Sequence, residues 1–129
     1  MPYVRIETRS GWLDGRSEEL FDAIDRALVA VLGVPPGDSL LRLHCHASAM
    51  MRLPQGADPR FVLLEVSLFP GRSLATKRAL YRALTDAVAA LGVPPEAVTV
   101  MLNEVALENW GIRNGQAASE VAFDFVIGV

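Results

Sequence analysis

Hydrophobic residues recur every three or four positions in two segments of the chain, and each segment is predicted to be an amphipathic helix. The apolar positions are Leu20, Ile24, Ala27, Leu28 and Val31 in the first segment, and Leu80, Leu84, Ala87, Val88 and Leu91 in the second. Ser17 and Ser73 are predicted to cap the helix starts, and Gly33 and Gly92 to follow the helix ends. A proline two residues after each glycine prevents either helix from continuing.

Short runs rich in valine, leucine and isoleucine flank both helices and are predicted to be strands. These runs are Tyr3–Glu7, Leu40–His46, Phe61–Leu68 and Val98–Val105. The segment Ala47–Arg60 contains two prolines and a glycine, and is therefore predicted to be a loop. The tail after Val105 is irregular, and its last part, Val121–Val129, is a candidate edge strand.

The same order of signals occurs twice along the chain. Gly15-Arg16-Ser17 precedes the first helix and Gly71-Arg72-Ser73 the second, which makes Arg16 and Arg72 structural counterparts. The second helical segment is longer by about one turn. Each β-α-β crossover should be right-handed and should pair its two strands in parallel. We therefore predict an α+β fold, in which tandem β-α-β repeats form a four-stranded, mainly mixed sheet with two helices on one face. The chain should form one domain over residues 1–129, with units at about 1–48 and 60–106 and a C-terminal tail.

Composition adds an argument for self-association. Hydrophobic residues make up 51% of the 129 residues and the mean hydropathy is +0.28, more than so small a domain can bury by itself. We expect the second face of the sheet to be apolar and covered by further copies. The net charge of −3 and the pI near 5.3 argue against nucleic-acid binding. The chain has no apolar run long enough to span a membrane, no apolar signal core at its start and a single cysteine, which together predict a cytoplasmic protein.

Pro2 is the first candidate for catalysis. Loss of Met1 would leave Pro2 at the N-terminus with a free secondary amine. The pKa of an α-amino group is about 7.7–8.0, and burial or a nearby cation lowers it, so the amine could act as a general base or acid. Proline at position 2 is also common without any such role. The equivalent position in the second unit, near residues 58–61, lies inside the chain and cannot carry a free amine.

A duplicated β-α-β unit that begins with Met-Pro resembles the tautomerase superfamily, and most of all its fused double-unit members related to malonate semialdehyde decarboxylase. The matching pieces are Pro2, Gly33-Val34-Pro35 followed by Asp38, Pro70-Gly71-Arg72-Ser73 with Lys77 beyond, and Glu108-Asn109-Trp110-Gly111. The resemblance implies an enzyme that needs no cofactor and uses Pro2 as catalytic acid or base. It also implies a homotrimer with sites where subunits meet, and a small 2-oxo or unsaturated carboxylic acid as substrate.

The resemblance assigns further residues. Asp38 matches a catalytic aspartate, and Arg72 matches the second of two arginines that hold the substrate carboxylate in the decarboxylase. Phe69 stands near the place of the first arginine, so tautomerisation is the leading prediction. Decarboxylation or hydration, with a 3-oxo acid such as malonate semialdehyde as substrate, is the alternative. A non-catalytic oligomeric binding protein is the second alternative.

Each of these residues also has an ordinary structural interpretation. Arg72 begins a helix, where the backbone N–H groups and dipole favour anions, but it could be a surface arginine like Arg16. Asp38 could hydrogen-bond an enediol oxygen or orient water, or it could be a turn aspartate. Phe69 and Trp110 could wall the substrate pocket and exclude water, or they could pack in the core or an interface.

The sequence predicts no metal site. His44 and His46 alternate onto one strand face and could share an ion, but no third ligand follows at a recognisable spacing. Cys45 faces the other side of the strand and is predicted to be a buried, small apolar residue.

Overall fold

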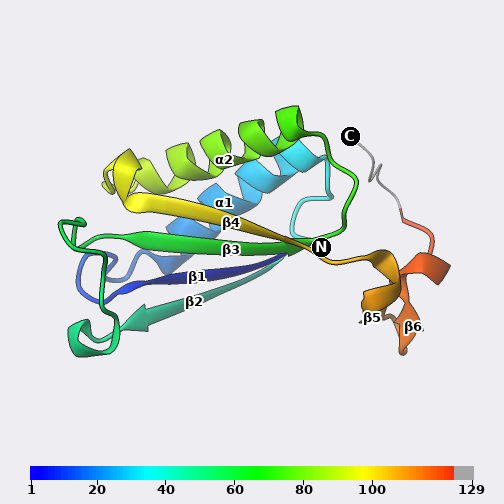
Figure 1. Cartoon of the computed structure of the whole chain (residues 1–129), viewed down its shortest axis with the longest axis horizontal. Helices are drawn as coiled ribbons and strands as arrows, with labels where there is room; N and C mark the ends of the chain where they lie inside the picture. Colours follow the sequence, from blue (N-terminus) through cyan, green and yellow to red (C-terminus); the bar gives the residue numbers. More distant parts are fainter. Residues whose placement is uncertain (124–129) are drawn as a thin grey trace.

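In the computed structural model, which describes residues 1–123, two helices lie across one face of a four-stranded sheet (Figure 1). The strands are β1 (Tyr3–Arg9), β2 (Leu40–His46), β3 (Val62–Leu68) and β4 (Val98–Glu104), and the helices are α1 (Ser17–Leu32) and α2 (Leu74–Ala89). The strand order is β2-β1-β3-β4. β1 pairs in parallel with β2, and β3 with β4, while β1 and β3 are antiparallel. The predicted α+β fold with a mixed sheet is confirmed.

The remaining elements are short. They are the 3₁₀ turns η1 (Ser48–Met50), η2 (Pro95–Ala97), η3 (Leu107–Asn109) and η4 (Ala118–Glu120), and the two-residue strands β5 (Gly111–Ile112) and β6 (Gln116–Ala117). β5 and β6 pair as a hairpin that lies beyond the end of β4 (Figure 1). The candidate edge strand Val121–Val129 falls mostly on residues 124–129, which lie outside the described part of the chain.

The core lies between the sheet and the helices. The strands β1 and β3 lie at the centre of the sheet and bury every second side chain, as strands with one covered face do. The helices meet them with the apolar stripes that the periodicity predicted, including Ile24 and Leu28 of α1 and Leu84 and Val88 of α2. Full burial of one such side chain stabilises the fold by about 1.5–3 kcal/mol.

The helix boundaries confirm some of the capping predictions and correct others. The Ser73 hydroxyl accepts the Thr76 N–H at 3.1 Å and caps α2, as expected. Gly33 follows α1 in the left-handed conformation at φ 70° and donates its N–H to the Val29 carbonyl, also as expected. The prediction for Ser17 is wrong, because a turn at Leu13–Arg16 starts the helix earlier and Ser17 is already helical.

The second half of the repeat differs from the prediction in length. Both helices have 16 residues, so the additional residues of the second unit lie in its connections rather than in an extra helical turn. α2 ends at Ala89, and Gly92 lies beyond it with φ 109°.

The prediction of an apolar second sheet face is wrong. The residues of β1 and β2 on the face away from the helices are Tyr3, Arg5, Glu7, Arg9, Leu40, Arg42, His44 and His46. Polar side chains dominate this face. Arg5 forms an ion pair with Glu65, and the Glu7 carboxylate lies 3.1 Å from Nε2 of His46. Many of the hydrophobic residues lie instead in the core between the helices and the sheet. In residues 1–123 neither helix is long and apolar enough to cross a bilayer.

Candidate active site

The antiparallel pairing of β1 and β3 brings the start of β1 beside the end of β3. Tyr3 is in register with Ser67, so Pro2 lies next to Leu68 and Phe69, where the chain leaves the sheet towards α2. Pro2 is buried, and its carbonyl accepts the N–H of Leu40 at 3.2 Å. A narrow crevice here, too small to hold a water molecule while Met1 is present, is lined by Met1, Pro2, Leu68, Phe69 and Arg72. The strand order therefore brings Pro2 and Arg72 together.

Arg72 is a buried cation with few protein partners. The residue is 7% exposed, its Nη1 donates to the Phe69 carbonyl at 3.3 Å, and its Nε has no hydrogen-bond partner within residues 1–123. Burial lowers the pKa of the guanidinium, while the negative charge of Glu104 acts in the opposite direction. An arginine remains charged in proteins, and a buried charge without partners is costly. This environment favours an anionic ligand and differs from that of a surface arginine.

Its counterpart in the first unit shows the contrast. Arg16 donates from Nη1 to the Leu91 carbonyl at 2.9 Å, and from Nε and Nη2 to the Glu19 carboxylate at 3.1 and 3.2 Å. The hydrogen bonds with Glu19 raise the pKa of Arg16. The repeat thus uses arginine twice before a helix. All three guanidinium nitrogens of Arg16 are hydrogen-bonded, whereas Nε of Arg72 has no partner within residues 1–123.

Asp38 lies in the connection between α1 and β2, on a second hollow near the chain start. The Met1 amino group donates to the Asp38 backbone carbonyl at 2.9 Å and to its carboxylate at 3.1 Å. The hollow measures about 280 Å³ and is lined by Met1, Tyr3, Pro35, Asp38, Ile112, Arg113 and Phe123. Met1, whose side chain is 10% exposed, borders both this hollow and the cavity at Arg72. The two spaces are therefore neighbours with Met1 in common.

Aromatic rings form a wall at this end of the sheet. The Phe69 and Trp110 rings meet edge to face at 5.4 Å, and Trp110 meets Tyr3 in the same way at 5.5 Å. Trp110 is fixed by its Nε1, which donates to the Val105 carbonyl at 2.9 Å. Phe69 is 2% exposed. Phe69 and Trp110, for which the sequence left open a pocket wall or ordinary packing, are in contact here.

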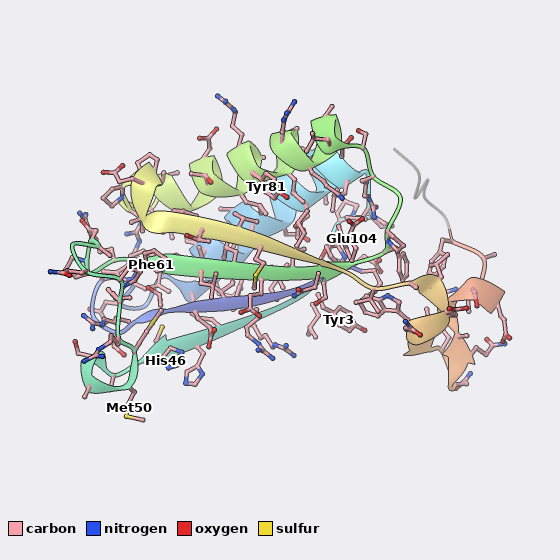
Figure 2. The ribbon with its side chains drawn as sticks, viewed as in Figure 1. Tyr3, His46, Met50, Phe61, Tyr81 and Glu104 are labelled. Carbon is pink, nitrogen blue, oxygen red and sulfur yellow. The ribbon has the colours of Figure 1, made fainter. Side chains whose placement is uncertain are left out.

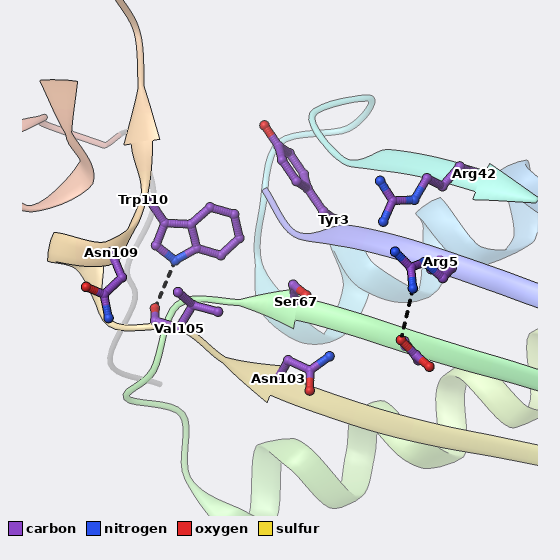
Figure 3. Close-up of a pocket in the computed structure, with 9 residues that line it drawn as sticks. Tyr3, Arg5, Arg42, Ser67, Asn103, Val105, Asn109 and Trp110 are labelled. Atoms are coloured by element: carbon purple, nitrogen blue, oxygen red, sulfur yellow. Dashed lines mark hydrogen bonds and ion pairs between the residues drawn. The ribbon is translucent and has the colours of Figure 1, made fainter. Parts of the chain in front are cut away.

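A larger pocket, of about 420 Å³, opens on the sheet face away from the helices (Figure 3). Its lining residues are Tyr3, Arg5, Arg42, Glu65, Ser67, Asn103, Val105, Asn109 and Trp110. Figure 3 shows Tyr3 and Trp110 at one end of it, and Arg5 and Arg42 further along the strands. Trp110 and Tyr3 thus lie between this pocket and the site at Pro2.

Arg113 is a candidate functional residue that the sequence analysis missed. It lies in the β5–β6 turn, lines the hollow that contains Asp38, and holds its guanidinium 5.6 Å from the centre of the Phe123 ring. Its φ of 43° is left-handed, a conformation that costs a non-glycine residue about 1–2 kcal/mol. Asn114-Gly115 is a sequence pattern typical of a turn, but nothing in the sequence predicts where this turn lies relative to Asp38.

Known proteins resemble this chain in sequence. Residues 38–113 match the family model described as tautomerase enzyme. The probable tautomerase YusQ of Bacillus subtilis is 26% identical over 123 residues, which cover 91% of this chain and 97% of that protein. A probable tautomerase of Ralstonia nicotianae is 45% identical over 51 residues, which cover 39% of this chain and 73% of that shorter relative.

Solved structures share the fold over nearly the whole chain. A fused 4-OT described as a symmetric trimer superposes with a TM-score of 0.82 at 27% identity, over 91% of this chain and 96% of that one. A malonate semialdehyde decarboxylase superposes with a TM-score of 0.79 at 30% identity, over 89% of this chain and 93% of that one. The family match, the relatives and the shared fold lead to one conclusion: the chain is an enzyme that belongs to the tautomerase family.

Proposed function

We propose that this enzyme is a cofactor-independent tautomerase that moves a proton next to the carbonyl of a small 2-oxo or unsaturated carboxylic acid. The observation that carries the proposal is the buried guanidinium of Arg72, which has an unpartnered Nε and shares a cavity with Pro2. A carboxylate is the natural ligand for such a group, because it accepts two parallel hydrogen bonds from a guanidinium.

The proposal requires the removal of Met1. Removal frees the Pro2 nitrogen and joins the cavity at Arg72 to the hollow that contains Asp38 and Arg113, because Met1 lines both. The Arg72 cation disfavours protonation of the nearby amine and thus lowers its pKa. A neutral proline amine near pH 7 is suited to act as a general base.

In the reaction, Arg72 holds the substrate carboxylate and the neutral Pro2 nitrogen takes a proton from the carbon beside the carbonyl. The enol oxygen that develops receives a hydrogen bond from a water molecule that Asp38 orients. The protonated Pro2 then returns the proton at the end of the conjugated system. Phe69 and Trp110 exclude bulk water, which strengthens these polar interactions.

Decarboxylation or hydration is the second candidate, and two observations support it. A malonate semialdehyde decarboxylase is 30% identical to this chain. Arg113 places a second cation beside the joined pocket, where it could replace the missing first arginine, whose place Phe69 takes. Release of carbon dioxide from malonate semialdehyde would support this activity, and no release at high enzyme concentration would eliminate it.

We also propose that the chain acts as one domain over residues 1–129 and assembles as a homotrimer. The support is the fold shared with the fused 4-OT that is described as a symmetric trimer. The sheet face away from the helices has both polar and apolar side chains, so burial of apolar surface on this face is not an argument for the trimer. Analytical ultracentrifugation tests the proposal: a mass of three chains supports it, and a monomer contradicts it.

The catalytic test begins with the mass of the purified chain, which shows whether Met1 is present. With Met1 removed, the enzyme should convert the enol form of phenylpyruvate to the keto form, and Pro2→Ala should lower kcat/KM by roughly 100-fold or more, the contribution expected of a general base. The Pro2→Ala variant still has an amine at residue 2, although a primary one. A preparation that retains Met1 is therefore the matched control, because its Pro2 nitrogen is part of a peptide bond. Full activity in Pro2→Ala or in the Met1 form would refute the catalytic role of Pro2.

A further inference from the structure

The two histidines of the chain meet a glutamate on the sheet face away from the helices. The His44 and His46 rings are stacked with their centres 3.9 Å apart, and Glu7 is in register with His44 on the neighbouring strand. The Glu7 carboxylate lies 3.1 Å from Nε2 of His46. One ligand atom from each of the three residues lies within 4.8 Å of the other two.

We infer that Glu7, His44 and His46 form a binding site for a divalent transition-metal ion such as Zn²⁺. Imidazole nitrogen and carboxylate oxygen bind zinc at about 2.0–2.2 Å, so two ligand atoms around a tetrahedral ion are roughly 3.4 Å apart. Binding therefore requires the stacked imidazoles and the carboxylate to rotate until their ligand atoms reach that separation. Three protein ligands leave a fourth position for water or another ligand.

The backbone holds these ligands in place. Residues i and i+2 of a strand face the same side, so both imidazoles project from β2 in one direction. Glu7 projects beside them because β1 and β2 pair in parallel, with Glu7 opposite His44. The side chains of His46 and Glu7 are 19% and 25% exposed, and His44 is exposed, which leaves the site accessible to an ion.

Three arginines share this sheet face and bear on which ion could bind. Arg9 donates from Nε to the Met51 carbonyl at 2.8 Å, and Arg5 pairs with Glu65 at 3.8 Å. Arg42, two residues before His44, has no ion pair within the described part of the chain. Its charge opposes an ion held mainly by electrostatic attraction to carboxylates, such as Mg²⁺ or Ca²⁺. Transition-metal ions, which bind imidazole nitrogen directly, are the better match.

The site is separate from the proposed catalytic centre. Glu7 is five residues from Pro2 along β1, a distance of roughly 16 Å at the rise of a strand. Figure 2 shows His46 and Tyr3 towards opposite ends of the sheet. The inference therefore does not depend on the reaction proposed for Pro2, and metal binding can be measured without an activity assay.

The experiment uses the full chain without a histidine tag, with Co²⁺ as the spectroscopic probe and Zn²⁺ as competitor. Visible absorption bands of imidazole-bound Co²⁺ should saturate at no more than one ion per chain and disappear when Zn²⁺ is added. His44→Ala, His46→Ala and Glu7→Gln should each weaken binding by at least tenfold. Cys45→Ser is the matched control, because Cys45 projects to the opposite face of β2 and its replacement should leave binding unchanged.

Thermal unfolding provides a second measurement that does not need the variants. An ion that binds only the folded protein raises the melting temperature, so Zn²⁺ should raise that of the wild-type chain. Circular dichroism shows whether each variant is folded before titration. The inference fails if the wild type binds Co²⁺ no more tightly than the His44→Ala, His46→Ala double variant. It also fails if Cys45→Ser abolishes binding, or if Zn²⁺ does not raise the wild-type melting temperature.

Discussion

Replacement of Arg72 by alanine should separate catalysis from stability. Within residues 1–123 the guanidinium makes one hydrogen bond, from Nη1 to the Phe69 carbonyl at 3.3 Å, and its buried Nε has no partner there. The hydrogen bond to the neutral Phe69 carbonyl contributes about 1 kcal/mol to stability. Removal of a buried charge that has few partners is favourable and offsets the loss of this bond. We therefore expect the free energy of unfolding to change by about 1 kcal/mol or less.

The expected loss of activity is much larger. A carboxylate held by the Arg72 guanidinium gains two charge-assisted hydrogen bonds, each worth about 1.5–3 kcal/mol. The loss of both amounts to about 3–6 kcal/mol, and each 1.36 kcal/mol corresponds to a factor of ten in rate. Arg72→Ala should thus lower kcat/KM by roughly 10² to 10⁴-fold, with most of the effect in KM if the two bonds are equally strong in the ground and transition states.

The assay is the initial rate of phenylpyruvate ketonisation, together with urea unfolding of the same preparations. Arg16→Ala is the matched control, because Arg16 occupies the equivalent place in the first unit and bonds to Leu91 and Glu19. It should lower stability slightly and leave kcat/KM within about twofold. Activity within fivefold of wild type in Arg72→Ala, or an equal loss of activity in Arg16→Ala, would refute the assignment.

Three further predictions concern the second cation, acid stability and the core. Arg113→Ala should raise KM for a 2-oxo dicarboxylate more than for phenylpyruvate, and an equal change for both would contradict a role in binding a second carboxylate. Hydrogen bonds from Arg60 lower the pKa of Asp58 from 3.8 to about 2, so Asp58 stabilises the fold above pH 4 and its contribution is lost as the pH falls towards 2. Asp58→Asn should flatten that decline in urea-unfolding midpoints. Replacement of Leu84, which is 0% exposed, by alanine should lower the free energy of unfolding, measured in urea, by about 2–5 kcal/mol.

Local periodicity was sufficient to predict the main elements of the fold. The strand predicted at Leu40–His46 has those bounds in the structure, and the other strands differ at their ends by one or two residues. Capping was less predictable, because it depends on neighbouring turns: Ser73 caps α2, whereas the turn at Leu13–Arg16 displaces Ser17 into α1. The character of the outer sheet face was predicted wrongly from total composition, which does not specify where apolar residues lie.

The candidate sites depend on relations between strands that a single sequence does not display. Pro2 and Arg72 share a cavity because β1 and β3 are antiparallel neighbours, which the repeat alone does not specify. Glu7 lies beside His44 because of the β1–β2 register, and so the sequence analysis counted two ligands where the structure brings three together. Cys45, predicted to be buried, is exposed because β2 is an edge strand.

The repeat allows the two ends of the sheet to be compared, one with the proposed catalytic residues and the other with their counterparts. Phe61 precedes β3 as Pro2 precedes β1, and the antiparallel pairing places these two residues at opposite ends of the sheet. At the Phe61 end the Thr8 hydroxyl donates to the Phe61 carbonyl at 2.7 Å, and Arg16 donates to the Leu91 carbonyl and the Glu19 carboxylate. At the Pro2 end Arg72 remains buried and incompletely paired. Within residues 1–123, the buried arginine with an unpartnered Nε is the one beside Pro2, which is the feature that the proposed carboxylate ligand accounts for.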